Sequence, residues 1–343
     1  MNNVKICILG TGAWGTALAC CLANNNFNVC LWGINQQEVN DLNQGYNRTF
    51  FGERPLFACV NATLDLKSAL FNADFILIAI PSTFITSVIK QVIEFLEHKK
   101  KYIVINVAKG LDEETKNVWS YTIYRLLNKF NVDIVTLIGP SFAIDVFEKK
   151  PTIVNVVSRK VDSAKKVAKM FNSNFFKAII IKDERGAQVL ASLKNLLAIA
   201  MGIAAENHNS INTVSALLTQ GINEMQTIAK HMGAKYDTIL QFCGIGDIFL
   251  TCTSDKSRNF TFGKKIFNEG VENVVKNNNT TVEGYKVYPI IQKIILEKNI
   301  DVPIFKLIIQ VLNQTIKPQN FVDLALEMIL QTSINKLKQE SEK

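Results

Sequence analysis

The sequence predicts an α/β domain with a doubly wound sheet over residues 1–183, followed by an all-helical domain over residues 184–337 and a charged tail over residues 338–343. Two patterns carry this prediction. Before about Lys182, short continuous apolar runs alternate with amphipathic segments, which is typical of a parallel sheet covered on both faces. After it, apolar residues recur at helical spacing and no convincing strand is visible. A chain of 343 residues is long enough for about two domains.

Each predicted strand is an apolar run that ends at a glycine, a proline or a polar turn. These runs cover residues 4–9, 27–32, 75–80, 102–107, 134–138, 151–158 and 178–181. The clearest predicted helices cover residues 16–23, 83–97 and 113–128 in the first domain, and 184–206, 212–232, 260–269, 285–298 and 321–337 in the second. Because ligands bind beyond the carboxyl ends of parallel strands, the residues that follow these strands are candidates for a site.

The first strand is followed at once by Gly10-Thr11-Gly12-Ala13-Trp14-Gly15, and then by small and apolar residues that suit a helix. In such a turn Gly10 allows the tight bend, Gly12 lets the backbone approach a pyrophosphate, and Gly15 lets the helix pack on the strand. Unpaired N–H groups at the helix N-terminus then attract the phosphates. A purely structural glycine turn is the alternative, but the strand–turn–helix context favours a Rossmann-like dinucleotide-binding domain.

Charge and composition argue against several other classes of partner. The net charge is +8, but the basic residues are scattered, and the one compact run, 99–101, has no interleaved aromatic residues. We therefore expect no nucleic acid as a partner. No residue spacing fits a metal site, so no metal is expected. The apolar segment 189–205 is barely long enough to span a membrane and is interrupted by Lys194, which indicates a buried helix and no transmembrane segment.

The seven cysteines are an odd number, and none belongs to a Cys-x-x-Cys pair. Five of them have apolar neighbours, namely Cys7, Cys20, Cys21, Cys30 and Cys59. These features predict buried, reduced thiols and a cytoplasmic protein. The N-terminal apolar run is too short for a signal peptide and continues directly into the glycine turn.

Lys194 is the most unusual residue of the chain, because it lies in an otherwise apolar, small-residue helix and is followed by Asn195. Burying an ammonium without partners is costly. One interpretation is a lysine whose charged end reaches solvent from a partly exposed helix face. The other is a lysine aimed into a cleft as a proton donor.

Two other places carry polar side chains that a simple fold does not require. Lys109 follows a core strand and precedes a glycine, which favours ligand contact over an ordinary surface loop. Farther on, glycines, a carboxylate, hydroxyls and a guanidinium gather in the segments 244–251 and 257–259. Arg258 suits a phosphate because its planar donors match phosphate oxygens. An ion pair between Asp247 and Arg258 that only ties down a loop is equally compatible with the spacing.

Taken together, these motifs resemble the bacterial-type NAD(P)-dependent glycerol-3-phosphate dehydrogenases, and the resemblance covers nearly the whole chain. The matching segments are the glycine turn with Trp14-Gly15-Thr16-Ala17-Leu18, Ala108-Lys109-Gly110-Leu111, Gly139-Pro140-Ser141-Phe142-Ala143, Leu193-Lys194-Asn195, Gly246-Asp247 with Thr251-Cys252, Ser257-Arg258-Asn259 and Val282-Glu283-Gly284-Tyr285. The lysine–asparagine pair and the serine–arginine–asparagine triplet are the specific ones, whereas many dehydrogenases share the glycine turn.

The resemblance implies reversible hydride transfer between NAD(P)H and dihydroxyacetone phosphate, which gives sn-glycerol 3-phosphate for glycerophospholipid synthesis. It also implies a cleft between the two domains and a homodimer. Lys194 is then the catalytic proton donor or acceptor. The residues implied at the substrate are Lys109, Gly139, Ser141, Lys194, Asn195, Asp247, Thr251, Ser257, Arg258 and Asn259. Those implied at NAD or NADP are Gly10, Gly12, Ala13, Trp14, Gly15, Lys109, Ala143, Arg258 and Glu283.

The segment after the second strand departs from the usual pattern of that family. Many members carry a basic residue there, where it meets a 2′-phosphate, whereas this chain reads Trp32-Gly33-Ile34-Asn35. With neither an arginine for NADPH nor an acidic residue for the NADH ribose at these positions, the sequence predicts weak discrimination between the two cofactors. A lysine or arginine from elsewhere, such as Arg48, could still reach in.

Two other functions are compatible with parts of the sequence. A two-domain reductase of another small anionic keto compound, of the ketopantoate or hydroxyacid type, would share the glycine turn and a lysine-bearing helix. It is not expected to carry Ser257-Arg258-Asn259. A non-catalytic nucleotide sensor on the same fold would have no need of Lys194 as a proton donor.

Overall fold

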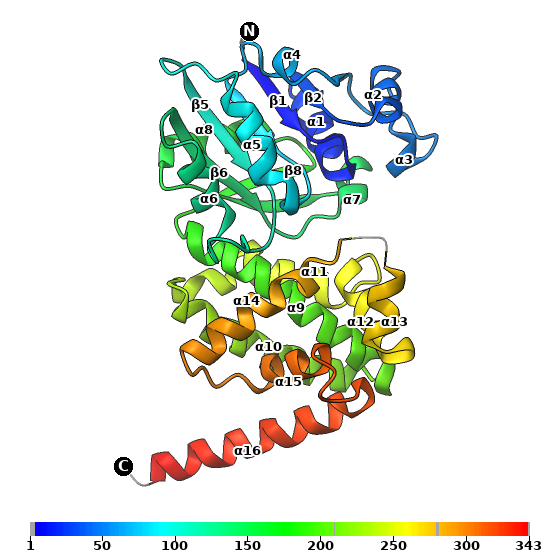
Figure 1. Ribbon diagram of the computed structural model, residues 1–343, viewed down its shortest axis with the longest axis vertical. Helices are drawn as coiled ribbons and strands as arrows, with labels where there is room; N and C mark the ends of the chain where they lie inside the picture. The colour runs from blue at the N-terminus through cyan, green and yellow to red at the C-terminus, as the bar shows by residue number, and fades with distance from the viewer. Residues whose placement is uncertain (1–3, 209, 279–280, 342–343) are drawn as a thin grey trace. The chain divides into compact units, whose positions relative to one another are not determined.

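The computed structural model describes residues 4–208, 210–278 and 281–341, which are drawn with their elements in Figure 1. The chain forms two compact units, Met1–Glu184 and Arg185–Lys343. The first is an α/β unit and the second is helical, so the predicted fold class is confirmed.

Eight strands of the first unit form one sheet in the order β3-β2-β1-β4-β5-β6-β7-β8. Their bounds are β1 (Lys5–Leu9), β2 (Asn28–Trp32), β3 (Asn61–Thr63), β4 (Phe75–Ile78), β5 (Lys101–Asn106), β6 (Asn131–Ile138), β7 (Thr152–Val157) and β8 (Phe176–Ile181). All the predicted strands are present. The sequence missed β3, because its three residues are too few to form an apolar run.

One pair of strands differs from the purely parallel sheet that the sequence predicted: β6 and β7 are antiparallel. Residues 139–151 join these strands and contain only the five-residue helix α7 (Ala143–Phe147). A crossover to a parallel neighbour usually contains a full helix packed on the sheet. The short connection instead turns the chain back, so that β7 and β8 run opposite to the other strands.

Helices cover both faces of the sheet (Figure 1). Besides α7, the first unit contains α1 (Ala13–Asn24), α2 (Gln36–Asn43), α3 (Arg48–Phe51), α4 (Leu66–Leu70), α5 (Ile85–Ile93), α6 (Trp119–Leu126) and α8 (Val161–Phe171). Alternate residues of β1 face the two layers: Ile6 and Ile8 belong to one buried apolar cluster, and Cys7 and Leu9 belong to the other. A strand with apolar side chains on both faces is what a doubly covered sheet requires.

The helix predicted over residues 113–128 is shorter in the structure, where α6 covers Trp119–Leu126. The carboxylate of Asp112 accepts hydrogen bonds from the hydroxyls of Thr115 at 2.6 Å and Thr122 at 2.8 Å. Local side-chain bonds of this kind stabilise a turn in competition with a helix.

All seven cysteines are free thiols. Cys7, Cys20 and Cys21 are buried as predicted, and burial raises the pKa of the Cys20 thiol to about 12. The prediction was wrong for Cys59, which is exposed, and Cys30 is only partly buried. Cys59 lies in the loop that precedes the edge strand β3, where apolar neighbours in sequence do not ensure burial.

The helical unit is built around one long apolar helix, α9 (Glu184–His208). The other helices are α10 (Ile211–His231), α11 (Asp247–Cys252), α12 (Arg258–Glu269), α13 (Val271–Asn277), α14 (Glu283–Glu297), α15 (Pro303–Leu312) and α16 (Phe321–Ser341). Residues Glu184–Asn207 are long and apolar enough to cross a membrane by length and composition alone, but their apolar window is entirely buried in the structure. This burial is that of a core helix, as the sequence predicted.

The last helix and the charged surface complete this unit. α16 extends beyond the other helices of its unit (Figure 1) and is helical to Ser341, so residues 338–341 of the predicted tail continue the helix. Residues 342–343 lie outside the described ones.

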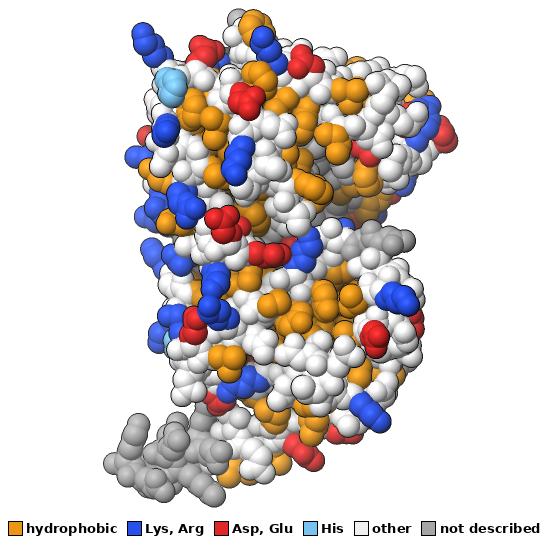
Figure 2. All heavy atoms as spheres, viewed as in Figure 1, with side chains coloured by type: hydrophobic (Ala, Val, Ile, Leu, Met, Phe, Trp, Pro, Cys, Tyr) orange, Lys and Arg blue, Asp and Glu red, His pale blue; other side chains and the backbone are white. Residues whose placement is uncertain are grey.

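On the face drawn in Figure 2, basic side chains are dispersed over both units with acidic ones between them. The surplus of basic residues is therefore spread out on that face.

A buried carboxylate binds the N-terminus of α15. Glu224 on α10 is 2% exposed and accepts hydrogen bonds from the backbone N–H groups of Ile304 at 3.1 Å and Phe305 at 3.0 Å. Gln220 donates another at 2.9 Å. Burial raises the pKa of Glu224 to about 7, although these three donors act in the opposite direction.

We therefore predict that Glu224→Gln removes a pH dependence of stability. Because the folded-state pKa of about 7 lies above the ordinary value of 4.5, this carboxyl favours folding most below about pH 4.5. That contribution is lost as the pH rises through 7, and amounts to on the order of 3 kcal/mol. The glutamine does not titrate.

The measurement is the free energy of unfolding by urea of the two proteins at about pH 5 and about pH 8. The free energy of unfolding of the variant should rise relative to that of the wild type as the pH increases. A difference that stays constant, or that moves in favour of the wild type, would mean that the N–H donors outweigh burial at this carboxyl.

Candidate active site

The glycine turn between β1 and α1 has the geometry of a phosphate cradle. Gly10 has a φ of +119°, and a β-carbon there would lie 2.6 Å from the carbonyl oxygen of Ala79. A β-carbon on Gly15 would lie 2.4 Å from the carbonyl oxygen of Gly10, so α1 packs directly on the turn. A β-carbon on Gly12 would meet nothing within 4 Å. The outer glycines are thus required by packing, whereas Gly12 leaves its backbone open to a ligand, as a pyrophosphate requires.

The N-terminus of α1, which starts with Ala13-Trp14, is available to an anion. Its N-cap is Gly12, which provides no side-chain hydrogen bond, and its first turn holds no acidic residue. Asn47 stabilises the turn: its buried amide donates to the carbonyl oxygen of Thr11 at 2.9 Å and to Oγ1 of Thr16 at 2.8 Å. Sequence reasoning missed Asn47, because it lies 36 residues from Thr11 and belongs to no motif.

The other predicted ligand-facing residues of this unit follow the carboxyl ends of neighbouring strands. β1, β4, β5 and β6 are adjacent and parallel, so these ends lie at one edge of the sheet. Lys109 follows β5 and is half-buried, and Gly139 directly follows β6. Ser141 donates from Oγ to the carbonyl oxygen of Gly139 at 3.0 Å, and Ala143 begins α7. The structure thus brings the predicted residues of the first unit to a single edge of its sheet.

Lys194 lies on α9 with only 1% of its surface exposed, which excludes a side chain that reaches solvent. Its Nζ atom forms an ion pair with Oδ1 of Asp247 at 2.5 Å and donates a hydrogen bond to Oγ1 of Thr251 at 2.7 Å. Thr251 gives its own hydroxyl proton to the carbonyl oxygen of Asp247 at 2.7 Å, so a lone pair of its oxygen accepts from the lysine. Asp247 is fully buried as well, and the two opposite charges compensate each other away from water.

The position of Asp247 depends on an irregular segment before α11. Phe242–Gly246 forms one π-helical turn, in which Gly244 has non-helical dihedrals of φ −92° and ψ −111°. A β-carbon on Gly244 would lie 2.1 Å from the carbonyl oxygen of Ile239, so no other residue fits there without a shift of the backbone. This close approach sets the start of α11 at Asp247, within reach of Lys194.

Two asparagines join three helices beside this ion pair. Asn259 on α12 donates from Nδ2 to Oδ1 of Asn195 at 3.1 Å, and its own Oδ1 accepts from the backbone N–H of Gly284 on α14 at 2.8 Å. A β-carbon on Gly284 would lie 2.4 Å from the carbonyl oxygen of Asn195. Glu283, the first residue of α14, is thereby held next to this cluster. Asn195 and Asn259 are therefore structural links as well as candidate ligands.

Ser257 and Arg258 mark the N-terminus of α12. Ser257 is the N-cap, and its Oγ accepts a hydrogen bond from the backbone N–H of Phe260 at 3.3 Å. Arg258 is the first residue of the helix and is exposed. Among the described residues, the ion-pair partner of Asp247 is Lys194, so the alternative pair of Asp247 with Arg258 is not formed.

Comparisons with known proteins show which family this chain is similar to. Family models described as the N-terminus and the C-terminus of NAD-dependent glycerol-3-phosphate dehydrogenase match residues 5–164 and 183–323. A protein of Malacoplasma penetrans named glycerol-3-phosphate dehydrogenase (NAD(P)+) is 48% identical over 338 residues, covering 98% of this chain and 100% of that protein. A protein of the same name from Mesoplasma florum is 36% identical, over 93% of this chain and 96% of that protein. The crystal structure of a glycerol-3-phosphate dehydrogenase from Coxiella burnetii matches with a TM-score of 0.85 and 29% identity, over 94% of this chain and 99% of that one.

We predict that the ion pair of Lys194 and Asp247 behaves as a coupled unit in stability. Asp247→Asn and Lys194→Met should each cost about 3–5 kcal/mol, because each removes the opposite charge that pairs with a buried ion. The double variant should cost clearly less than the sum of the two, which a double-mutant cycle of urea unfolding measures. Additive losses would mean that the two groups do not compensate each other.

Proposed function

Because the chain belongs to the family of NAD-dependent glycerol-3-phosphate dehydrogenases, we propose that Lys194 is the acid and base of its hydride-transfer reaction. The enzyme is an NAD(P)-dependent oxidoreductase that interconverts dihydroxyacetone phosphate and sn-glycerol 3-phosphate. Because the chain belongs to this family, we do not retain the two alternatives, a ketopantoate-type reductase and a nucleotide sensor. The observation that carries the proposal is the buried ammonium of Lys194. This lysine lies on an otherwise apolar helix and is bound by Asp247 and Thr251.

The residues of the first unit fit the cofactor. NAD or NADP supplies or accepts the hydride when it is bound. The backbone at Gly12 and the first N–H groups of α1 would hold its pyrophosphate, because this is the open side of the turn. The further residues proposed to contact it are Ala13, Trp14, Lys109, Ala143, Arg258 and Glu283.

The proton step follows from the contacts of Lys194. Reduction of the ketone at C2 leaves negative charge on the carbonyl oxygen, and Nζ of Lys194 gives a proton to that oxygen; in the reverse direction it takes the proton back. Asp247 stabilises the ammonium, which is buried away from water, and the hydrogen bond to Thr251 fixes the orientation of the Nζ group. A positioned proton donor of this kind contributes roughly 10²–10⁴-fold to the rate.

The phosphate of the substrate is assigned to Arg258. Its guanidinium stands at the start of α12, where the positive end of the helix adds to its own charge. Ser257 and Asn259 flank it in the sequence. The remaining residues proposed to line the substrate are Lys109, Gly139, Ser141, Lys194, Asn195, Asp247 and Thr251.

The cellular setting is likewise a proposal. sn-Glycerol 3-phosphate is the backbone of glycerophospholipids, which suggests that the enzyme supplies lipid synthesis from the cytoplasm. We further propose that it acts as a homodimer, as the resemblance to the family implies. A mass in solution near that of one 38.4 kDa chain would contradict the dimer.

We predict that Lys194→Met lowers kcat for dihydroxyacetone phosphate by about 10²–10⁴-fold, because methionine keeps the length of the side chain but holds no proton. Oxidation of NADH or NADPH, followed by absorbance, measures the rate. The matched control is Lys264→Met on α12, which removes a surface lysine paired with Glu206 and Asp255 and should leave the rate unchanged. If the Lys194 variant keeps more than about a tenth of the activity while it remains folded, the proton comes from elsewhere.

We predict that Arg258→Ala lowers kcat/KM for dihydroxyacetone phosphate by about tenfold to a hundredfold, the loss expected for one charge-assisted hydrogen bond. The slow reaction with unphosphorylated dihydroxyacetone should change far less, because it makes no phosphate contact. Steady-state kinetics with both ketones give the two ratios. Equal losses for the two ketones would show that Arg258 does not serve the phosphate.

A further inference from the structure

An acidic side chain lies against the glycine turn, although the sequence positions after β2 carry no charge. Glu38 in the first turn of α2 accepts a hydrogen bond from Oγ1 of Thr11, the residue between the first two glycines. The turn and the segment after β2 are in close contact, since a β-carbon on Gly33 would lie 2.5 Å from Cγ2 of Thr11. Glu38 therefore stands beside the backbone that is proposed to hold the cofactor.

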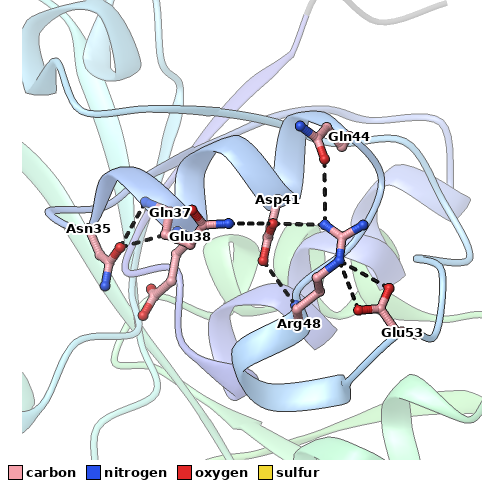
Figure 3. A network of polar contacts seen from close by, with 7 residues as sticks. All are labelled: Asn35, Gln37, Glu38, Asp41, Gln44, Arg48 and Glu53. Carbon is pink, nitrogen blue, oxygen red and sulfur yellow. Dashed lines mark hydrogen bonds and ion pairs between the residues drawn. The ribbon is translucent and has the colours of Figure 1, made fainter.

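The start of α2 fixes the position of this carboxylate. Asn35 is the N-cap, and its Oδ1 accepts from the backbone N–H groups of Gln37 at 2.9 Å and Glu38 at 3.3 Å. A carboxylate in the first turn is also stabilised by the helix dipole. Figure 3 shows the Glu38 side chain directed away from Arg48. Among the described residues, only one oxygen of this carboxylate has a hydrogen-bond partner, so the other can accept a bond from a ligand.

Arg48, which the sequence suggested as a cation for a 2′-phosphate, is already engaged in ion pairs with Asp41 and Glu53. Its NH1 group lies 2.8 Å from Oδ1 of Asp41, and its Nε atom donates to both carboxylate oxygens of Glu53 at 3.1 and 3.0 Å. The guanidinium also stacks on the ring of Tyr46 at 4.4 Å. The hydrogen bonds with Asp41 and Glu53 raise the pKa of Arg48 above its ordinary value. In Figure 3 the carboxylates of Asp41 and Glu53 lie at the Arg48 guanidinium, whereas Glu38 points away from it.

We propose that Glu38 is a specificity-determining residue that selects NADH over NADPH, a proposal that rests on binding of the cofactor at the glycine turn. A ribose 2′-hydroxyl can donate a hydrogen bond to the open oxygen of Glu38. A 2′-phosphate has no proton to donate at neutral pH and meets a repelling charge instead. Ile34, which is 86% exposed, offers nothing to offset this repulsion. The weak discrimination expected from Ile34 and Asn35 alone is thereby replaced by a preference for NADH.

The test compares two variants that each remove one negative charge from this network. Glu38→Gln keeps an acceptor for Thr11, so the fold is retained, and a melting temperature checks this. Glu53→Gln is the matched control, because Glu53 is 78% exposed and lies on the far side of Arg48. Dissociation constants of NADH and NADPH are measured by fluorescence for the wild type and both variants, without substrate.

The wild type should bind NADH about tenfold to a hundredfold more tightly than NADPH, the range of one hydrogen bond to a charged group. Glu38→Gln should abolish most of this ratio, by weaker binding of NADH and tighter binding of NADPH. Glu53→Gln should leave the ratio within about threefold of the wild type. The same pattern is expected in kcat/KM for the two cofactors.

Four outcomes would overturn the proposal. Equal affinities in the wild type, or a ratio that Glu38→Gln leaves unchanged, would show that Glu38 does not select. A change with Glu53→Gln alone would show that release of Arg48 is what governs the 2′-phosphate. Binding of neither nucleotide would remove the glycine turn as the cofactor site, and this result, unlike the others, would also contradict the proposed function.

Discussion

A buried ammonium has to be compensated where it lies, and this requirement organises the helical unit. Lys194 sits among apolar and small residues of α9, and its charge is balanced by Asp247 at 2.5 Å. Asp247 reaches that position because Gly244 lets the chain before α11 approach the backbone of Ile239. At the residue after Lys194, Gly284 allows α14 to approach the carbonyl oxygen of Asn195 in the same way. The surroundings of Lys194, the proposed proton donor, therefore depend on glycines that have no chemical role of their own.

The features that the sequence predicted correctly are those written in short stretches of chain. An apolar run between turn residues is enough to define a core strand, and three spaced glycines between a strand and a small-residue helix are enough to define the tight turn that joins them. Lys194 stood out for a related reason: one charged residue contradicts an otherwise apolar helix, and that mismatch is visible without a structure. The relation of the strand ends also followed, because adjacent parallel strands must present their carboxyl ends at one edge.

The features that the sequence did not predict depend on contacts between distant residues. Asn47 braces the turn across 36 residues, Glu38 reaches Thr11 across 27, and Thr251 meets Lys194 across 57. Spacing alone suggested Arg258 as a possible partner of Asp247, whereas the ion pair with Lys194, 53 residues away, follows from the fold. The early start predicted for α6 failed for a different reason: Asp112 and its threonines hold a turn that hydrophobic periodicity does not register.

The charged residues around Lys194 and around Arg48 illustrate two different uses of ion pairing. Around Lys194, the ammonium pairs with the buried carboxylate of Asp247. Around Arg48 two carboxylates, those of Asp41 and Glu53, pair with one guanidinium at a partly exposed surface, where ion pairs contribute little to stability. Because both of these carboxylates are engaged by Arg48, Glu38 is the carboxylate of this region that faces the glycine turn, which is the basis of its proposed role in selecting NADH. A proton donor requires a charge that is compensated until the substrate takes its proton. The proposed selection against a 2′-phosphate requires instead a charge left uncompensated, which agrees with an Arg48 held by Asp41 and Glu53 and a Glu38 that faces the turn.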